Sequence, residues 1–374
     1  MSDDVRRALA RIDTSAIEAN CGLLASKLGE GTELCAVVKA NGYGHGAAPA
    51  AAAAMRGGAT RLAVAAAAEA EELRLHFPYA PLLVMGALTE RELRLAMDAR
   101  AEVAVWREGF RKLASRLAGE RAETLRVHVK HDSGMGRLGE RDPEAVVELA
   151  RAVAGDERLE LAGVWTHFAT ADEDDRGYLA EQLAAFEPVA ERVRGLAPDC
   201  IVHAANSAAT LREPGSHFDM VRCGIAIYGL DPFHSDPAGE GLKPAMELRS
   251  YVADVKRFEA GASAGYGRTW RAPADGWVGV LPIGYGDGVR RALGNAGEVL
   301  VRGTKRSIAG TVSMDNLTID LGPETDVEPG DEAVLIGEQG SERILAEDLA
   351  RQLDTINYEI TTGISPRVPR AHGP

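Results

Sequence analysis

The feature that most constrains the fold of this chain is a repeated alternation of short apolar runs with helical stretches between residues 34 and 229. Eight apolar runs, each bounded by turn residues, are typical of buried strands. They are residues 34–38, 62–65, 82–84, 102–105, 125–128, 161–165, 201–203 and 220–223. Stretches rich in Ala, Leu, Glu and Arg lie between them and predict helices, as at 49–55, 66–77, 109–118, 143–154 and 176–196. Strands and helices in this order predict a (β/α)8 barrel of the TIM type.

The pattern changes after about residue 230, where strands are separated by Gly, Pro and Asp turns. The strands expected are 248–258, 276–282, 298–301, 306–309, 317–320 and 332–336, with one helix at 346–353. This composition predicts a mostly antiparallel β domain. We therefore expect a barrel domain over residues 1–240 and a β-strand-rich domain over 241–374, joined by a linker at 231–241. A strand at 8–12 could join either domain.

Net charge, cysteine spacing and the lack of long apolar runs disfavour several kinds of partner, site and location. The net charge of −14 disfavours nucleic acids and anionic membranes. The four cysteines lie far apart without a C-x-x-C pair, so we expect reduced, packed thiols rather than disulfides or a metal site; they are Cys21, Cys35, Cys200 and Cys223. The polar N-terminus has no signal-peptide pattern, and no apolar run reaches membrane-spanning length, so a cytoplasmic protein is expected.

Lys39 is the first candidate for chemistry, because it ends an apolar run and opens a glycine-rich turn. Barrels of this type carry their active sites at the C-terminal ends of the strands. Lys39, residues 128–130, His167 and His203 all fall at or just past predicted strand ends. A desolvated lysine has a lowered pKa and can act as an imine-forming amine or as a base. The alternative is a surface lysine whose stem packs on the protein.

Further motifs follow in a fixed order along the chain. They are Ala-Val-Val-Lys-Ala-Asn-Gly-Tyr-Gly-His-Gly (36–46), Lys-His-Asp-Ser-Gly-Met-Gly-Arg-Leu-Gly (130–139), Thr-His-Phe-Ala-Thr-Ala-Asp (166–172), His-Ala-Ala-Asn-Ser (203–207), Val-Arg-Cys-Gly-Ile-Ala-Ile-Tyr-Gly (221–229), Gly-Tyr-Gly-Arg-Thr (265–269), Gly-Tyr-Gly-Asp-Gly (284–288), Ser-Met-Asp-Asn (313–316) and Asn-Tyr-Glu (357–359). In this order they resemble the motifs of the alanine racemases over nearly the whole chain. The resemblance implies a barrel followed by a β domain. It also implies a head-to-tail homodimer, in which the partner's β domain completes each active site.

The resemblance assigns the two acid/base groups. Lys39 is implied to carry pyridoxal 5'-phosphate as a Schiff base and to serve the D-antipode. Tyr266 is implied to serve the L-antipode from the other subunit. A phenol titrates near ~10, so Tyr266 needs positive charge nearby to work at neutral pH. A lone tyrosine would more often be a packed aromatic with a bonded hydroxyl.

The resemblance also assigns the groups that bind the cofactor. Arg222 is implied to donate a hydrogen bond to the pyridine nitrogen. A guanidinium stays protonated, so it can donate to that nitrogen but cannot accept a proton from it. The ring nitrogen then stays unprotonated, which favours racemisation over transamination. His203 is expected to orient Arg222, and His167 to lie near the ring. The remaining cofactor-binding positions are Tyr43, Asn206, Ser207, Gly224, Ile225 and Tyr358, where backbone N–H groups and hydroxyls suit a phosphate. Each of these is an ordinary turn or core residue if taken alone.

Substrate binding is implied at Arg137, whose fork fits a carboxylate, together with the backbone N–H of Met314 from the partner. Two states stay open for Lys130, a carbamylated side chain that fixes Arg137 or a plain lysine in an ion pair. Asp172, Tyr285 and Arg291 resemble residues of the access channel. Three positions depart from the family pattern: Ser313 replaces a common cysteine, Gly265 a common serine and Gly286 a common alanine.

The leading interpretation is an alanine racemase that interconverts L- and D-alanine and supplies D-alanine for peptidoglycan. The altered pocket positions keep open a racemase that prefers serine or another small amino acid. A decarboxylase on a similar barrel would need an acidic partner for the pyridine nitrogen, which Arg222 argues against. A non-catalytic cofactor-binding protein would resemble the barrel alone, and the β domain argues against it. No metal is expected.

Overall fold

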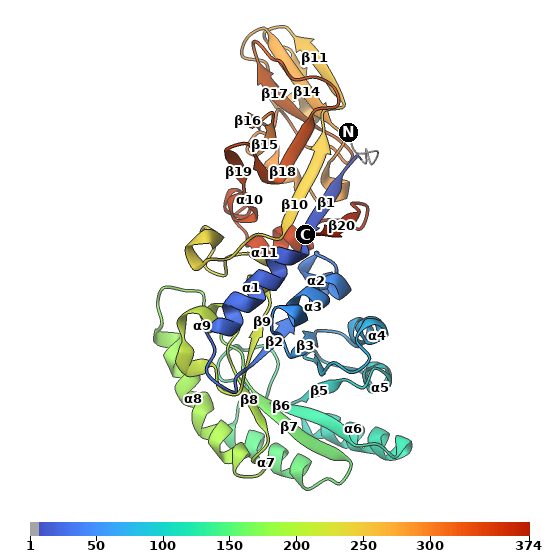
Figure 1. The fold of residues 1–374 in the computed structure, drawn as a ribbon, viewed down its shortest axis with the longest axis vertical. Helices are drawn as coiled ribbons and strands as arrows, with labels where there is room; N and C mark the ends of the chain where they lie inside the picture. The colour runs from blue at the N-terminus through green and yellow to red at the C-terminus, as the bar shows by residue number, and fades with distance from the viewer. Residues whose placement is uncertain (1–6) are drawn as a thin grey trace. The chain divides into compact units, whose positions relative to one another are not determined.

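The computed structural model describes residues 7–374, which form two compact units (Figure 1). The barrel unit comprises residues 17–43 and 47–227, and the β unit comprises residues 7–16, 44–46 and 228–374. Among the helices of residues 7–374, none combines the length and the apolar character needed to cross a membrane.

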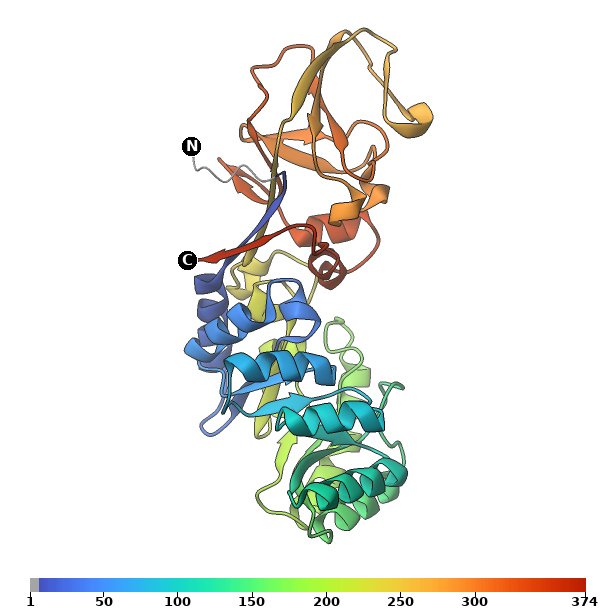
Figure 2. The ribbon, with the colours of Figure 1, turned by 90° about the vertical axis from the view of Figure 1, so that its right-hand side faces the viewer.

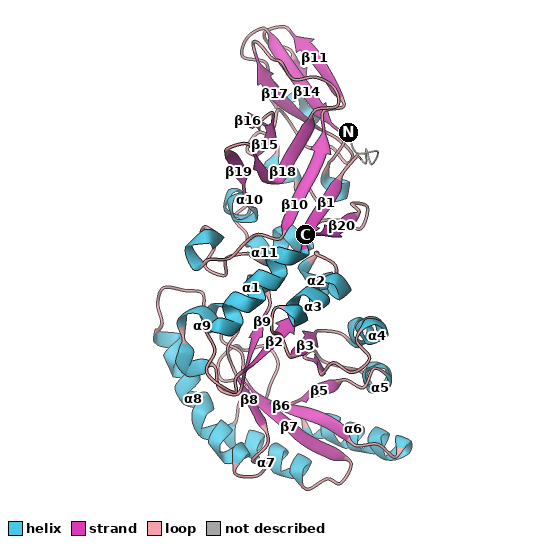
Figure 3. Ribbon diagram, in the orientation of Figure 1, coloured by secondary structure: helices cyan, strands magenta, loops and turns pink. Residues whose placement is uncertain are grey.

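The barrel unit is a closed parallel barrel of eight strands, as the sequence predicts (Figure 3). The strands are β2 (Glu33–Val37), β3 (Arg61–Val64), β4 (Leu82–Val84), β5 (Glu102–Val105), β6 (Leu125–Lys130), β7 (Leu159–Trp165), β8 (Ile201–His203) and β9 (Met220–Cys223). Strand β9 pairs with β2 and closes the barrel. Nearly every strand residue is buried, because side chains fill the inside and helices cover the outside.

Helices follow the strands and turn apolar faces toward them. They are α1 (Thr14–Ser26), α3 (Ala47–Arg56), α4 (Ala67–His76), α5 (Glu90–Asp98), α6 (Glu108–Arg121), α7 (Pro143–Ala154), α8 (Gly177–Arg194) and α9 (Ser207–Arg212). The segment labelled α2 (Lys39–Tyr43) is a turn with left-handed backbone rather than a regular helix. Helix α7 is an example of how the sequence sets a helix. At its start, Asp142 accepts a hydrogen bond from the Glu144 N–H and Pro143 occupies the first turn. Val146, Ala150 and Val153 are buried on its apolar face. Such caps fix where each helix begins and thus where the preceding loop ends.

The β unit contains a seven-stranded sheet with the order β16-β15-β18-β10-β1-β20, in which β19 also pairs with β18; Figure 1 labels these strands, and Figure 2 gives the view turned by 90°. Its strands are β1 (Leu9–Asp13), β10 (Met246–Tyr251), β15 (Glu298–Val301), β16 (Thr304–Ser307), β18 (Glu332–Gln339), β19 (Glu342–Ile344) and β20 (Arg370–Gly373). Strands β11 (Asp254–Phe258), β14 (Gly276–Leu281) and β17 (Leu317–Gly322) form a second sheet, and β12 (Ser263–Ala264) pairs with β13 (Trp270–Arg271). Helices α10 (Ala346–Gln352) and α11 (Asn357–Thr362) complete the unit. The pairing is antiparallel except between β1 and β20.

Two expectations from the sequence were wrong in detail. The single strand expected at 248–258 is two strands in different sheets, β10 and β11. The chain switches sheets between them because the Val252 N–H donates to Asp331 O (2.8 Å) and the Ala253 N–H to Val280 O (2.7 Å). Strand β6 also runs on to Lys130, so His128 lies inside the strand rather than at its end. The strand expected near residues 8–12 is β1, which belongs to the β unit.

Candidate active site

Lys39 follows β2 on a turn with unusual backbone geometry. Ala40, Asn41 and Gly42 have φ values of 51°, 52° and 62°, a left-handed region that ordinary residues rarely adopt. Two side-chain contacts hold this turn: Glu69 accepts from the Ala40 N–H (2.6 Å), and Asn41 accepts from the Ala47 N–H (3.0 Å). Burial, together with the charge of Arg137, lowers the pKa of Lys39. The turn therefore presents an amine whose charged form is disfavoured by its surroundings.

Three strand ends converge on a small polar cradle beside this lysine. Tyr43 follows β2, Ser207 follows β8, and Gly224 follows β9. The Ser207 hydroxyl accepts hydrogen bonds from the N–H groups of Gly224 (3.0 Å) and Ala226 (3.3 Å). A Cβ atom at position 224 would lie 2.3 Å from the Tyr43 hydroxyl oxygen, so only glycine fits.

The rest of the cradle is rigid. Asn206 caps α9, where its side chain accepts from the Ala209 N–H (3.0 Å), and this fixes the position of Ser207. Ile225 is buried at the start of the next turn. Burial raises the pKa of Tyr43, so its hydroxyl keeps its proton and can donate to an anion. The cradle thus offers hydroxyl and N–H donors of the kind that bind phosphate.

Arg222 lies in β9 and is buried. Its Nη1 donates to His203 Nδ1 (3.0 Å), and its Nη2 donates to Thr166 O and Ala204 O (both 2.8 Å) and to His167 Nδ1 (3.2 Å). Burial lowers the pKa of Arg222 to about 10, so the guanidinium stays charged at neutral pH. Hydrogen bonds to the described residues leave from Nη1 and Nη2 alone, which keeps the Nε–H for a bound molecule.

Both histidines that contact Arg222 are neutral. Burial first, and then the charge of Arg222, hold the pKa values of His167 and His203 well below 6.5. A neutral imidazole can accept a hydrogen bond at one nitrogen, as both do here. The guanidinium is therefore oriented by acceptors that carry no charge.

Lys130, at the end of β6, is buried without an ion pair to the described residues. Its Nζ lies 4.0 Å from the centroid of the Trp165 ring. Burial and the charges of Arg222 and Arg137 lower its pKa to about 7, against the opposing influence of Asp132. A large fraction of Lys130 is therefore uncharged at neutral pH.

Arg137 lies on the glycine turn that follows β6 and is exposed. Asp132 shapes this turn by accepting from the N–H groups of Gly134 (3.2 Å) and Gly136 (2.9 Å). Arg137 makes no ion pair with the residues described, yet its charge lowers the pKa of both Lys39 and Lys130. The guanidinium is available to an anion close to these amines. Asp172 is exposed in the loop between β7 and α8.

The β unit gathers a second group of the expected residues on neighbouring turns. Tyr266, Met314 and Tyr285 are 73%, 51% and 43% exposed. The Thr311 hydroxyl donates to Tyr266 O (2.9 Å), and the Tyr285 N–H donates to Ser313 O (2.9 Å). The segment 311–314 therefore links the turns that carry these three side chains. Arg291 is exposed on its own turn, and Tyr358 is half-buried on α11.

Two structural residues of the site, Trp165 and Glu102, were not singled out from the sequence, and His128 was noted only for its place at a predicted strand end. Trp165 stacks on His203, with ring centroids 5.6 Å apart and an interplanar angle of 4°. His128 and Glu102 continue the hydrogen bonds of His203 deeper into the barrel. The one signal available in the sequence was Glu102, which directly precedes the apolar residues 103–105. A carboxylate buried in such a strand needs hydrogen-bond partners.

The fold and the site together define the class, a barrel enzyme in which a lysine of lowered pKa and a buried arginine lie at strand ends. A family model described as "Alanine racemase, N-terminal domain" matches residues 12–232, and one described as "Alanine racemase, C-terminal domain" matches residues 245–372. The chain belongs to the alanine racemase family.

Individual members of the family are similar to this chain over nearly their full lengths. The alanine racemase of Symbiobacterium thermophilum is 41% identical, with 99% of this chain and 98% of that protein covered. That of Geobacillus stearothermophilus is also 41% identical, with coverage of 99% and 94%. The solved structure of the alanine racemase from Streptomyces coelicolor A3(2) superposes with a TM-score of 0.93 at 39% identity, covering 100% of this chain and 99% of that one.

Proposed function

We propose that this protein is a pyridoxal-phosphate-dependent racemase that interconverts L- and D-alanine. The observation that carries the proposal is the buried Arg222, whose hydrogen bonds to the described residues leave its Nε–H for a ligand. An arginine at that place would donate to a ring nitrogen without giving up a proton. The protein would supply D-alanine for peptidoglycan, and a cytoplasmic location stays a prediction.

The residues of the barrel unit fit the cofactor. The cradle of Tyr43, Ser207, Gly224 and Ile225, supported by Asn206, would hold the phosphate, and Tyr358 is expected to add its hydroxyl. Arg222 would hold the ring nitrogen beside His167, and Lys39 would form the covalent link. When bound, the cofactor supplies a conjugated ring that withdraws electrons from the substrate's α-carbon.

Lys39 and Tyr266 would move the proton on the two faces of the α-carbon. Racemisation needs one group that removes the proton and another that returns it on the opposite side. The lowered pKa of Lys39 favours the free amine that the D-antipode requires. The Tyr266 hydroxyl would act on the L-antipode, and the exposure of its side chain supports a role in the partner subunit's site.

Arg137 would clamp the substrate carboxylate in a bidentate pair, with the Met314 N–H of the partner as a further donor. Lys130 would be carbamylated, since its pKa of about 7 leaves the neutral amine that reacts with carbon dioxide. The resulting anion would hold Arg137 in place. Electron density for a bare ammonium at Lys130, in crystals grown with bicarbonate, would contradict this assignment.

A head-to-tail homodimer is part of the proposal. Tyr266, Tyr285 and Met314 are large side chains left exposed by the chain on its own, and they lie on turns linked through 311–314. Burial of such side chains by a second copy would complete each site, with Asp172, Tyr285 and Arg291 lining the entry. Light scattering should give twice the mass of the 374-residue chain.

The test is an assay of racemisation from L to D and from D to L, on alanine and on serine, with purified protein saturated with pyridoxal phosphate. We expect kcat/KM for alanine to exceed that for serine, and Lys39→Ala to abolish both. Serine could be preferred because Gly265, Ser313 and Gly286 alter the pocket, and a reversed ratio would establish that alternative. Failure on both substrates would overturn the proposal.

A further inference from the structure

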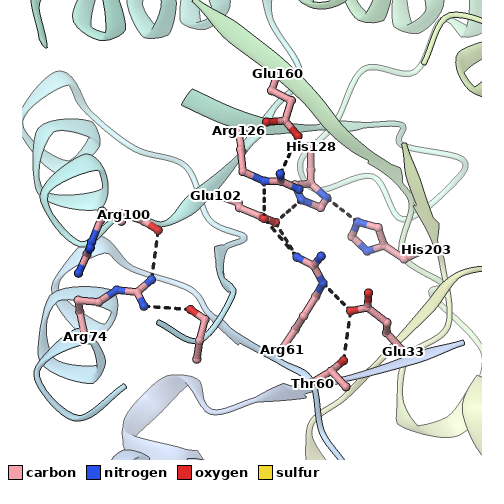
Figure 4. Close-up of polar contacts among 11 residues, drawn as sticks. Glu33, Thr60, Arg61, Arg74, Arg100, Glu102, Arg126, His128, Glu160 and His203 are labelled. Atoms are coloured by element: carbon pink, nitrogen blue, oxygen red, sulfur yellow. Dashed lines mark hydrogen bonds and ion pairs between the residues drawn. The ribbon is translucent and has the colours of Figure 1, made fainter. Parts of the chain in front are cut away.

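A series of buried hydrogen bonds joins Arg222 to Glu102 inside the barrel, and Figure 4 draws its part from His203 through His128 to Glu102. His203 Nδ1 is 3.0 Å from Arg222 Nη1, and His203 Nε2 is 2.9 Å from His128 Nδ1. His128 Nε2 in turn lies 2.7 Å from a carboxylate oxygen of Glu102. These hydrogen bonds thus connect β9 through β8 and β6 to Glu102, the first residue of β5.

The chemistry of the two ends fixes the direction of every bond in this chain. Arg222 can only donate, so His203 accepts at Nδ1 and carries its proton at Nε2. That proton is donated to His128 Nδ1, which leaves His128 with its own proton at Nε2. His128 then donates to Glu102. A reversal at either ring would place two N–H groups against each other.

Glu102 is able to serve as the anionic end. Burial by itself would raise its pKa, but the hydrogen bond from His128 and the charges around it lower that pKa to about 2. The charges include Arg61, with a nitrogen 3.2 Å from the carboxylate, and Arg126, with a nitrogen at 2.8 Å. The carboxylate is therefore ionised at neutral pH.

The barrel also leaves room for the two histidines of this hydrogen-bond series. Position 163 on β7 is glycine, and a Cβ atom there would lie 2.1 Å from His128 Nδ1. The register between β6 and β7 shifts next to His128, between Val127 and His128. Trp165 covers the His203 ring in a parallel stack. Each of the two imidazoles therefore has one position and one pair of partners.

We propose that Glu102 and His128 are positioning residues that set the orientation of Arg222. The ionised carboxylate holds both histidines in the Nε2–H form, which keeps His203 Nδ1 an acceptor and the guanidinium a donor with its Nε–H turned to the site. The consequence for catalysis rests on the proposed function. The proton positions do not depend on it.

The experiment combines neutron diffraction with kinetics on the protein saturated with pyridoxal phosphate. In the unmodified protein, deuterons should be found on Nε2 of both His128 and His203 and on neither Nδ1. In Glu102→Gln we expect mixed tautomers and a loss of about tenfold in kcat, with KM changed by less than about twofold, because orientation rather than substrate affinity is affected.

Glu160→Gln is the matched control. Glu160 lies in the same cluster of charges, with its Oε1 2.6 Å from Arg126 Nη1, and makes no hydrogen bond with either histidine. This variant should keep the tautomers and stay within about twofold of the original kcat, as surface ion pairs contribute little. Gly163→Ala, which crowds His128 without removing a charge, should reproduce the loss in kcat and covers the case in which Glu102→Gln fails to fold.

A deuteron on Nδ1 of either histidine in the unmodified protein would overturn the proposal, as would a Glu102→Gln variant with unchanged tautomers and kcat. A protein that binds pyridoxal phosphate but racemises neither alanine nor serine would overturn the proposed function instead. In that case the deuteron positions would still decide the inference about Glu102 and His128.

Discussion

The two units hold their candidate residues in opposite ways. In the barrel unit, Arg222 and His203 are buried and fixed by several hydrogen bonds each, on strands whose register is set by a closed sheet. In the β unit, Tyr266 and Met314 extend from turns and are largely exposed. Under the proposed function, the barrel half would bind the cofactor with residues of one chain, and the β half would supply side chains whose surroundings come from a second copy.

The largest effect is expected from Tyr266→Phe, which tests the exposed half of the comparison. Removal of the hydroxyl should lower kcat by about 10²- to 10⁴-fold, the usual contribution of a general acid/base. Cofactor binding and melting temperature should hardly change, because the aromatic ring is kept and only the hydroxyl is removed. The visible spectrum and both directions of turnover provide the measurement. Unchanged turnover in both directions would refute the role of Tyr266.

Gly224→Ala tests the buried, hydrogen-bonded residues of the barrel unit. The added methyl group would meet the Tyr43 hydroxyl at 2.3 Å in a site where every neighbour is buried. Overpacking of this kind costs about 1–3 kcal/mol, so the Kd for pyridoxal phosphate should rise by roughly 10- to 100-fold. Titration of the apoenzyme with the cofactor measures this effect. The matched control is Gly267→Ala in the exposed turn, which should leave the cofactor Kd unchanged.

The pH dependence of stability tests the environment of Lys130. Its pKa is lowered in the folded protein to about 7 from an ordinary value of 10.5, so the unfolded chain binds more protons between these values. Stability should therefore rise with pH from about 7 upward, and the rise should be smaller in Lys130→Gln. Urea denaturation at several pH values in buffer free of carbon dioxide measures the difference. Equal slopes in the two proteins would show that the lysine is not desolvated.

Gly286→Ala should give the smallest effect, although it restores the residue common in the family. A Cβ atom there would lie 2.4 Å from Arg367 Nη1, and the exposed arginine can move aside. The Arg367–Asp315 ion pair (2.7 Å) would be disturbed, next to Met314. Because exposed ion pairs contribute little, we expect kcat/KM to change by less than about threefold. A larger change would indicate that Arg367 fixes the Met314 turn.

The sequence predicted the barrel well because its strands are buried on both faces and read as short apolar runs. It predicted the break at Val252 and Ala253 poorly, because the apolar pattern continues where the chain changes sheets. The contact between His128 and His203 could not be predicted, since it depends on strand register. His128 lies opposite Gly163 and His203 opposite Trp165, and no local pattern specifies these pairs.

The candidate residues themselves came from motifs, and their local geometry could not be read from the sequence. The left-handed backbone at Ala40 and Asn41 is an example, because these residue types do not require it and the contacts with Glu69 and Ala47 impose it. The lowered pKa of Lys130 depends likewise on Arg137 and Arg222, which come from different strand ends.

The central claim, that one base comes from each of two chains, is tested most directly by mixing two inactive variants. Lys39→Ala and Tyr266→Phe should each lack alanine racemisation alone. After dissociation and reassociation together, half of the dimers would combine both chains and carry one intact site, so about a quarter of the original activity should return. No recovery, in a mixture shown to contain the mixed dimer, would contradict a site shared between subunits.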